Sequence, residues 1–160
     1  MKKDLFIDNN IAKNFCNPLD KNYIALISWL LFFDSNDYSN IVNYAHLVVS
    51  KKLLIEYSRS VQNAKSDTSI PIIINKLLAE GRLIIKTNQE IKEFKRKFYS
   101  KTIVRRFRSN SEDREHIPLV LLAERKYGLS YDINFIYDLV NFPGFNVFVE
   151  KRPEKLPYSK

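Results

Sequence analysis

Four acidic residues stand at positions where a carboxylate could take part in chemistry. Asp8 closes the apolar stretch "LFID", and Asp132 closes the later stretch "LSYD". Glu56 lies in a helical pattern that follows a second apolar stretch, and Asp113 precedes another helical pattern. In open parallel sheets, ligands bind at the carboxyl ends of the strands, so acids at these places are candidates for a common site.

Each of these acids also has a purely structural interpretation. Asp8 could cap the next helix or solvate a turn. Glu56 has three basic neighbours on its predicted helix, which permits an ordinary helix ion pair. Asp113 would be favoured at a helix start by capping and by the helix dipole alone. Asp132 could begin a turn. The functional interpretation therefore requires that the fold bring the four carboxylates together.

The pattern of apolar stretches predicts an α/β fold. Short strands are expected at about 5–8, 46–50, 82–87, 129–132 and 145–150, with helical patterns between them at about 21–33, 51–61, 70–80 and 88–108. Strands that are apolar throughout and separated by helices indicate a parallel sheet covered on both faces. We therefore predict a three-layer α/β/α architecture with about five strands. Residues 1–153 are expected to form one domain, and 154–160 a C-terminal tail.

Local signals fix some of the predicted boundaries. Ser50 is a candidate N-cap for the helix that carries Glu56. Gly81 is expected to end the later helix at 70–80. The stretch 34–40 is predicted to be a polar loop. Pro118 is tolerated only in the first turn of a helix, so that helix should begin near 113–117, with Asp113 at its N-terminus.

The four acidic motifs together resemble the PIN domains, the metal-dependent ribonuclease fold of bacterial toxins and RNA-processing nucleases. The stretches that carry the resemblance are "LFIDNNIAKNF", "HLVVSKKLLIEY", "EDREHIPLVLLAERKYG" and "LSYDINF", in the order in which the family has them, with "FNVFVEKRP" similar to its last strand. Asn9 stands where the family usually has a hydroxyl residue. Glu112, Asp113 and Glu115 lie close together, so each of them is open as the third acid.

The resemblance implies a catalytic metal site formed by Asp8, Glu56, Asp113 and Asp132. These carboxylates would hold one or two Mg²⁺ or Mn²⁺ ions, and oxygen ligands are those that such cations prefer. Two ions can activate a water and stabilise the leaving oxygen of a phosphodiester. The implied function is a metal-dependent endoribonuclease. A homodimer is also possible, and a toxin would have a small antitoxin protein as its partner.

Two alternatives remain beside the nuclease. The first is a PIN-like protein that binds RNA without cleaving it, and the second is a scaffold or interaction domain with no nucleic-acid role. Phosphate contacts do not distinguish the sugar, so DNA is not excluded as the substrate. His116, one turn from Asp113, could be imagined as a general base, but a surface or capping histidine is expected.

The positive charge is concentrated in one segment. Residues 76–108 hold eleven Lys or Arg and three Glu, whereas the rest of the chain holds fifteen residues of each sign, so the net charge of +8 belongs to this segment. Such a segment favours a polyanionic partner such as RNA, or it forms a solvated helix face. Its aromatic residues could stack on unpaired bases, but core packing is the preferred interpretation.

Composition excludes several other classes. Three glycines argue against a glycine-rich phosphate loop. A single cysteine, Cys16, precludes an intrachain disulfide framework and favours a reducing, cytoplasmic location; with only two histidines, it also argues against a Cys/His zinc site. No targeting segment is expected at the N-terminus. The longest apolar run, 23–33, is too short to cross a bilayer, so no membrane partner is expected.

Overall fold

The computed structural model describes residues 1–61, 63 and 65–160 of the chain. Within them, five strands form one parallel sheet in the order β3-β2-β1-β4-β5. The strands are β1 (Lys3–Ile7), β2 (Ala45–Val49), β3 (Leu83–Ile85), β4 (Tyr127–Leu129) and β5 (Phe148–Glu150). Each lies at or within a few residues of its predicted place, and the predicted α/β class is confirmed.

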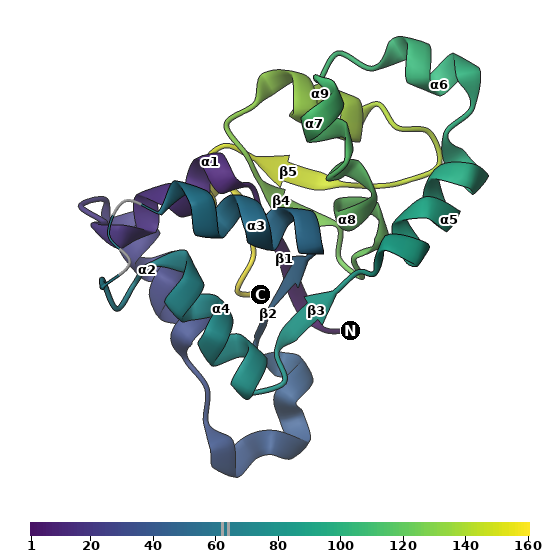
Figure 1. The fold of residues 1–160 in the computed structure, drawn as a ribbon. Helices are drawn as coiled ribbons and strands as arrows, with labels where there is room; N and C mark the ends of the chain where they lie inside the picture. The colour runs from purple at the N-terminus through teal and green to yellow at the C-terminus, as the bar shows by residue number, and fades with distance from the viewer. Residues whose placement is uncertain (62, 64) are drawn as a thin grey trace.

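Helices cover both faces of the sheet. The first group follows β1 and β2 and consists of α1 (Asn9–Ala12), α2 (Lys21–Leu31), α3 (Lys51–Ser60) and α4 (Ile70–Ala79). The second group consists of α5 (Asn88–Phe98), α6 (Lys101–Arg106), α7 (Ser111–Arg114), α8 (Ile117–Leu122) and α9 (Ile133–Val140). The 3-10 helices η1 (Lys13–Cys16), η2 (Ser35–Asn43) and η3 (Pro153–Lys155) lie outside these two groups. In Figure 1 the first group, purple to teal, and the second group, green, lie on different sides of the strands.

The central strands are buried on both faces, as this arrangement requires. In β1, Leu5, Phe6 and Ile7 are all fully buried, and every residue of β2 is buried. α2 contacts β2 from the first group, while α8 contacts β1 and β2 from the second. A strand between two helical layers has no face exposed to solvent, which explains the consecutive apolar residues in these two strands. The predicted three-layer architecture is confirmed.

The order of the strands creates one special place at the carboxyl edge of the sheet. From β1 the chain moves outward to β2 and β3, and then returns to place β4 on the other side of β1. The carboxyl ends of β1 and β4 therefore form a topological switch point, where the two connections part and where ligands bind in open α/β sheets. Asp8 follows β1 directly, and Ser130 follows β4 directly.

The prediction of one long basic helix over 88–108 was wrong. The chain breaks between α5 and α6 at Tyr99, whose ψ of 78° is not helical. Ser100 then caps α6, since its hydroxyl accepts a hydrogen bond from the backbone N–H of Ile103 at 3.2 Å. A serine that satisfies a free N–H can start a new helix inside an apparently continuous helical pattern. The stretch predicted as a polar loop at 34–40 lies mostly within η2.

Two boundaries near the acids also differ from the prediction. Pro118 lies in the first turn of α8, as expected, but Asp113 belongs to the separate short helix α7. Asp132 does not close a strand, because β4 ends at Leu129, where its pairing with Ile7 ends. Asp132 is instead the N-cap of α9, a helix that was not predicted. Both acids nevertheless remain at the carboxyl edge of the sheet.

The last residues pack against the rest of the chain. Leu156, within the expected tail, is buried, and the rings of Trp29 and Tyr158 lie 4.8 Å apart. The guanidinium of Arg125 donates to the carbonyl oxygen of Tyr158 at 2.8 Å. Among the described residues, no helix combines the length and the apolar character needed to cross a membrane.

Candidate functional site

Asp8 is a buried carboxylate at the switch point. It is the first residue after β1, and its backbone N–H donates a hydrogen bond to the carbonyl oxygen of Leu129 on β4. Only 7% of its surface is exposed. It occupies the N-cap position of α1, yet its side chain makes no capping hydrogen bond. Burial raises the pKa of Asp8 above its usual value. Asp8 thus occupies the capping position that one structural interpretation gave it, but its side chain is buried and forms no capping hydrogen bond to α1.

Two polar side chains hold the Asp8 carboxylate in place. The hydroxyl of Ser130 donates to Asp8 Oδ2 at 2.6 Å, and the amide of Asn10 lies 3.3 Å from the same oxygen. Asn10 also accepts from the backbone N–H of Tyr131 at 3.1 Å, so it links the residues that follow β1 and β4. The hydrogen bond from Ser130 opposes the rise in the pKa of Asp8 and favours its charged form.

Glu56 approaches Asp8 from α3. Its carboxylate oxygen Oε2 lies 2.8 Å from Nε2 of His116, whose side chain is only 2% exposed. The next residue, Tyr57, is fully buried and donates its hydroxyl proton to the carbonyl oxygen of Ile7, which anchors α3 beside the end of β1. Within the described residues Glu56 forms no ion pair with Lys or Arg, so the alternative of an ordinary helix ion pair is not found. His116 was expected to be a surface or capping residue: it does occupy the N-cap position of α8, without a side-chain capping hydrogen bond, but it is buried and not on the surface.

Asp113 and Asp132 form a pair of interacting carboxyl groups. Asp132 accepts the backbone N–H groups of Asn134 and Phe135 through Oδ1, so it does cap α9. Its carboxyl group also hydrogen-bonds with that of Asp113. Burial, this hydrogen bond, and the negative charges of Asp132 and Asp8 raise the pKa of Asp113 to about 6. Burial is the largest of these causes, and the neighbouring carboxylates add to it by disfavouring a further negative charge.

This raised pKa predicts how stability depends on pH without metal. The ordinary pKa of the group is 3.8, so the folded protein holds the Asp113 proton longer than the unfolded chain does. The free energy of unfolding should therefore fall as the pH rises from about 4 to about 6, and stay lower above that range. Asp113→Asn removes the penalty. We expect the variant to be more stable than wild type by ~1 kcal/mol at pH 8, because solvent screens this half-exposed group.

Urea unfolding in the presence of EDTA at pH 4 and pH 8 measures this difference. At pH 4 the wild-type carboxyl group is already largely protonated in the folded state, so wild type and Asp113→Asn should unfold at similar urea concentrations. A variant less stable than wild type at pH 8 would show that the charged form of Asp113 contributes stabilising contacts instead of crowding.

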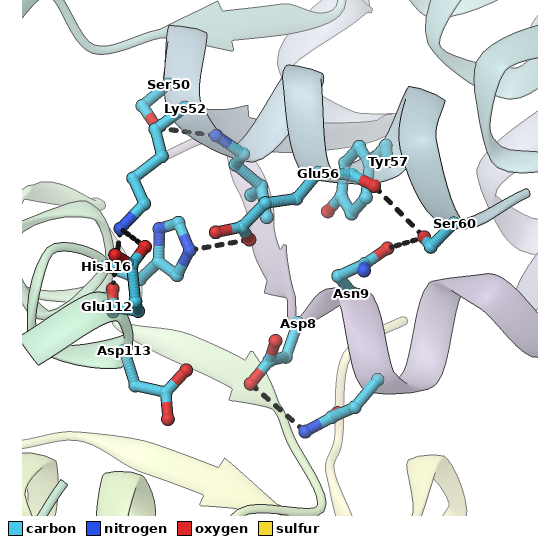
Figure 2. A network of polar contacts seen from close by, with 12 residues as sticks. Asp8, Asn9, Ser50, Lys52, Glu56, Tyr57, Ser60, Glu112, Asp113 and His116 are labelled. Carbon is cyan, nitrogen blue, oxygen red and sulfur yellow. Dashed lines mark hydrogen bonds and ion pairs between the residues drawn. The ribbon is translucent and has the colours of Figure 1, made fainter. Parts of the chain in front are cut away.

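Neighbouring ion pairs distinguish Asp113 from the two acids beside it. Glu112 pairs with Lys52 of α3 at 2.7 Å, and Glu115 pairs with Lys95 of α5. These pairs tie the two sides of α7 to α3 and α5. Asp113 has neither partner and is directed toward the other acids. Figure 2 shows the carboxylates of Asp113 and Asp8 pointing toward a common space, with Glu56 and His116 beside it. This geometry favours Asp113 as the third acid.

A further buried acid positions the segment that carries Asp113. Asp138 of α9, only 3% exposed, accepts the backbone N–H groups of Arg108 and Ser109 at 2.8 and 2.9 Å and the Ser109 hydroxyl at 2.5 Å. Asn110 then caps α7 by accepting from the N–H of Asp113 at 2.9 Å. The chain just before Asp113 is thus fixed by hydrogen bonds to a charged group, which are stronger than neutral ones.

The structure therefore brings all four predicted acids to one place. Asp8 responds to the charge of Glu56, and Asp113 responds to the charges of Asp8 and Asp132. In residues 1–61, 63 and 65–160, however, no group of three or more His, Cys, Asp or Glu side chains is arranged to hold a metal ion as they stand. In this arrangement Asp8 accepts a hydrogen bond from Ser130, and Glu56 pairs with His116.

Several residues of the site were missed at the sequence level. Asn10 and Ser130 had a weak signal, since each stands within two residues of a candidate aspartate. Tyr57 and Asp138 had no sequence signal beyond their place in an amphipathic helix. The partner of Tyr57 lies 50 positions away, and the partners of Asp138 lie 29 and 30 positions away. Such contacts exist only once the helices are packed.

The aromatic side chains of the basic segment belong to the core. Phe94 is buried, and its ring lies 4.7 Å from that of Phe98 and 5.7 Å from that of Phe145. The rings of Tyr99 and Phe107 lie 5.3 Å apart in the same cluster. The preferred interpretation of these residues as core packing is confirmed.

Comparisons of this chain with protein-family models, with curated proteins and with solved structures found no match. The function must therefore be argued from the site itself.

Proposed function

We propose that this protein is a metal-dependent nuclease that hydrolyses phosphodiester bonds of RNA in the cytoplasm. The observation that carries the proposal is the convergence of Asp8, Glu56, Asp113 and Asp132 at the switch point of a parallel sheet, where ligands bind in such folds. The resemblance of the four motifs to PIN domains supports the same function.

The chemistry of these side chains fits a divalent cation. Mg²⁺ and Mn²⁺ prefer carboxylate oxygens, and Asp8 is already buried and oriented by Ser130. Burial and the neighbouring carboxylates raise the pKa of Asp113, and a bound cation would lower it by favouring the charged form. When bound, the ion would supply charge stabilisation to the phosphodiester as negative charge develops on it. We assign Asp8 and Asp132 as principal ligands, with Glu56 and Asp113 completing the acidic group.

The chain's own residues would then have distinct tasks. Ser130 and Asn10 keep the Asp8 carboxylate aimed into the site. His116 fixes Glu56 from the side away from solvent. Asp113 must lose its proton before it can act as a ligand. At subsaturating Mn²⁺, metal binding and the activity that depends on it should therefore rise with pH through the region near 6, as Asp113 ionises.

A cleavage assay on labelled single-stranded RNA tests the proposal. Wild type should cleave with Mn²⁺ or Mg²⁺ and not with EDTA. Asp113→Asn should lower the rate at least about a hundredfold, since it removes a ligand of the reacting centre. The matched control is Glu112→Gln, a neighbouring acid that pairs with Lys52 instead, and it should cleave almost as well as wild type. Equal loss in both variants would contradict the assignment.

A second candidate function is binding of RNA without cleavage. The pair between Glu56 and His116 and the hydrogen bond between Asp113 and Asp132 favour it, because these acids are already satisfied without a cation. In that case the wild-type protein would bind the labelled RNA in EDTA as well as in Mn²⁺, and the RNA would remain intact in both. The same assay with DNA of equal sequence decides the sugar preference.

A further inference from the structure

Two hollows lie side by side next to Glu56, between α3 and α5. One, of about 330 Å³, is lined by Glu56 itself together with residues of α3; the other, of about 240 Å³, is lined by residues of α5. Both are lined by Lys52 and Asn88, so they adjoin at these two residues, and we name the two hollows together the α3–α5 groove. Glu56, one of the four acids, lines one end of this groove.

The groove is strongly basic. Five positively charged side chains line it: Lys51, Lys52, Arg59, Lys92 and Lys95. Apart from Glu56, its acids are Glu112 and Glu115, which are engaged with two of the lysines. Three of the five bases come from α3, outside the segment that carries the excess positive charge in the sequence. The fold therefore adds basic residues to this segment at one place beside the site.

Three of these bases are available to a ligand. In the described part of the chain, Lys51, Arg59 and Lys92 form no ion pair, and all three residues are exposed. The other two lysines are held by exposed carboxylates. The side chain of Glu112 is 76% exposed and that of Glu115 is 43% exposed. Exposed ion pairs contribute little to stability, so a phosphate can replace these carboxylates.

We propose that the α3–α5 groove binds the phosphate backbone of a nucleic-acid strand and leads that strand to the acidic group. The inference rests on the proposed nuclease function and adds the path of the substrate. Successive phosphates would contact Lys92 at one end and Lys51 and Arg59 near Glu56, while Lys52 lies where the two hollows meet. Contacts of this kind give affinity that depends on salt and carry no base sequence.

Binding of RNA without cleavage tests the groove. The full chain with Asp8→Asn, in EDTA, is titrated with a labelled single-stranded RNA at several salt concentrations. The groove variant adds Lys51→Gln, Arg59→Gln and Lys92→Gln. We expect it to bind roughly tenfold more weakly or worse, and the slope of log affinity against log salt to be smaller by about 2, since each lost phosphate contact removes about 0.7.

Two matched variants remove the same charge elsewhere. Lys21→Gln, Lys151→Gln and Lys155→Gln change exposed lysines that do not line the groove, and this variant should bind with nearly the original affinity and slope. A second variant with Arg96→Gln, Lys101→Gln and Arg105→Gln changes exposed bases of α5 and α6 outside the groove. If this variant loses affinity while the groove variant keeps it, the groove is overturned as the path.

The outcomes also separate the groove from the proposed function. RNA binding that depends on the groove, with no cleavage by wild type in Mn²⁺, would support the groove and contradict the nuclease. Cleavage by wild type, together with unchanged binding by the groove variant, would support the nuclease and overturn the groove. Absence of RNA binding by the Asp8→Asn chain would likewise overturn the groove.

Discussion

Asp8→Asn is expected to lower kcat/KM for RNA cleavage by about a thousandfold or more, which corresponds to about 4 kcal/mol of lost transition-state stabilisation. The substitution removes the negative charge at the centre of the acidic group but keeps the shape of the side chain. The new amide oxygen can still accept the hydrogen bond that Ser130 donates. A comparison of cleavage rates in Mn²⁺ measures the effect.

The same variant should be at least as stable as wild type without metal. Burial raises the pKa of Asp8, so the charged carboxylate destabilises the folded state at neutral pH. A residue that costs stability and is required for activity is typical of a functional site. If Asp8 served the fold instead, its replacement would lower stability and leave cleavage unchanged.

Asp20 provides the matched control. It also stands directly before a helix, and its carboxylate does cap that helix, since it accepts the backbone N–H of Asn22 at 2.8 Å. Asp20→Asn should therefore cleave RNA at nearly the wild-type rate, because asparagine is also a good N-cap. Cleavage by Asp8→Asn at the rate of Asp20→Asn would contradict the assignment of Asp8 to the site.

Arg82→Ala is expected to have the largest effect on stability, a loss of about 3–5 kcal/mol in the free energy of unfolding. The Arg82 side chain is fully buried at the amino edge of the sheet, just before β3. Its Nη1 donates to the carbonyl oxygens of Leu30 and Ala45 at 2.9 and 2.8 Å, and its Nε donates to Glu80 at 3.0 Å. It thus links the end of α2 to the start of β2.

The loss should appear as a melting temperature lower by roughly 10 °C for a chain of this size. Lys76→Ala is the control, because Lys76 pairs with the same Glu80, at 3.3 Å, but its side chain is 45% exposed. That surface pair should contribute less than about 1 kcal/mol to the free energy of unfolding.

Because Arg82 lies at the edge of the sheet opposite the acids, Arg82→Ala should still cleave RNA at a temperature where it is folded. Similar melting temperatures for the two variants would contradict the role of Arg82.

The sequence allowed the class of the fold and the meeting of the acids to be predicted. The consecutive apolar residues at 5–7 in β1 and at 47–49 in β2 indicate strands of a parallel sheet between two helical layers. Once the sheet is parallel, Asp8 must reach the carboxyl edge, and Glu56 on the helix after β2 must lie near it. These predictions follow from the period and order of the elements.

The contacts that arrange the site could not be predicted in this way. His116 meets Glu56 across 60 positions, and Tyr57 meets the end of β1 across 50. Each contact depends on the rotation of a helix against the sheet, which is set by packing and not by local pattern. The predictions at Ser100 and Asp132 failed for a different reason. At both places a side chain caps a new helix, and capping competes locally with the continuation of a helix or strand.

The most direct test of the proposed site is the thermal unfolding of wild type and Asp8→Asn with and without Mn²⁺. A cation that binds only the folded protein stabilises it by mass action, by about 2.7 kcal/mol at a hundred times its dissociation constant. We expect the wild-type melting temperature to rise by roughly 5–10 °C at saturating Mn²⁺, and the rise to be largely lost in Asp8→Asn. An unchanged wild-type melting temperature up to millimolar Mn²⁺, or an equal rise in Asp8→Asn, would contradict a metal site at Asp8.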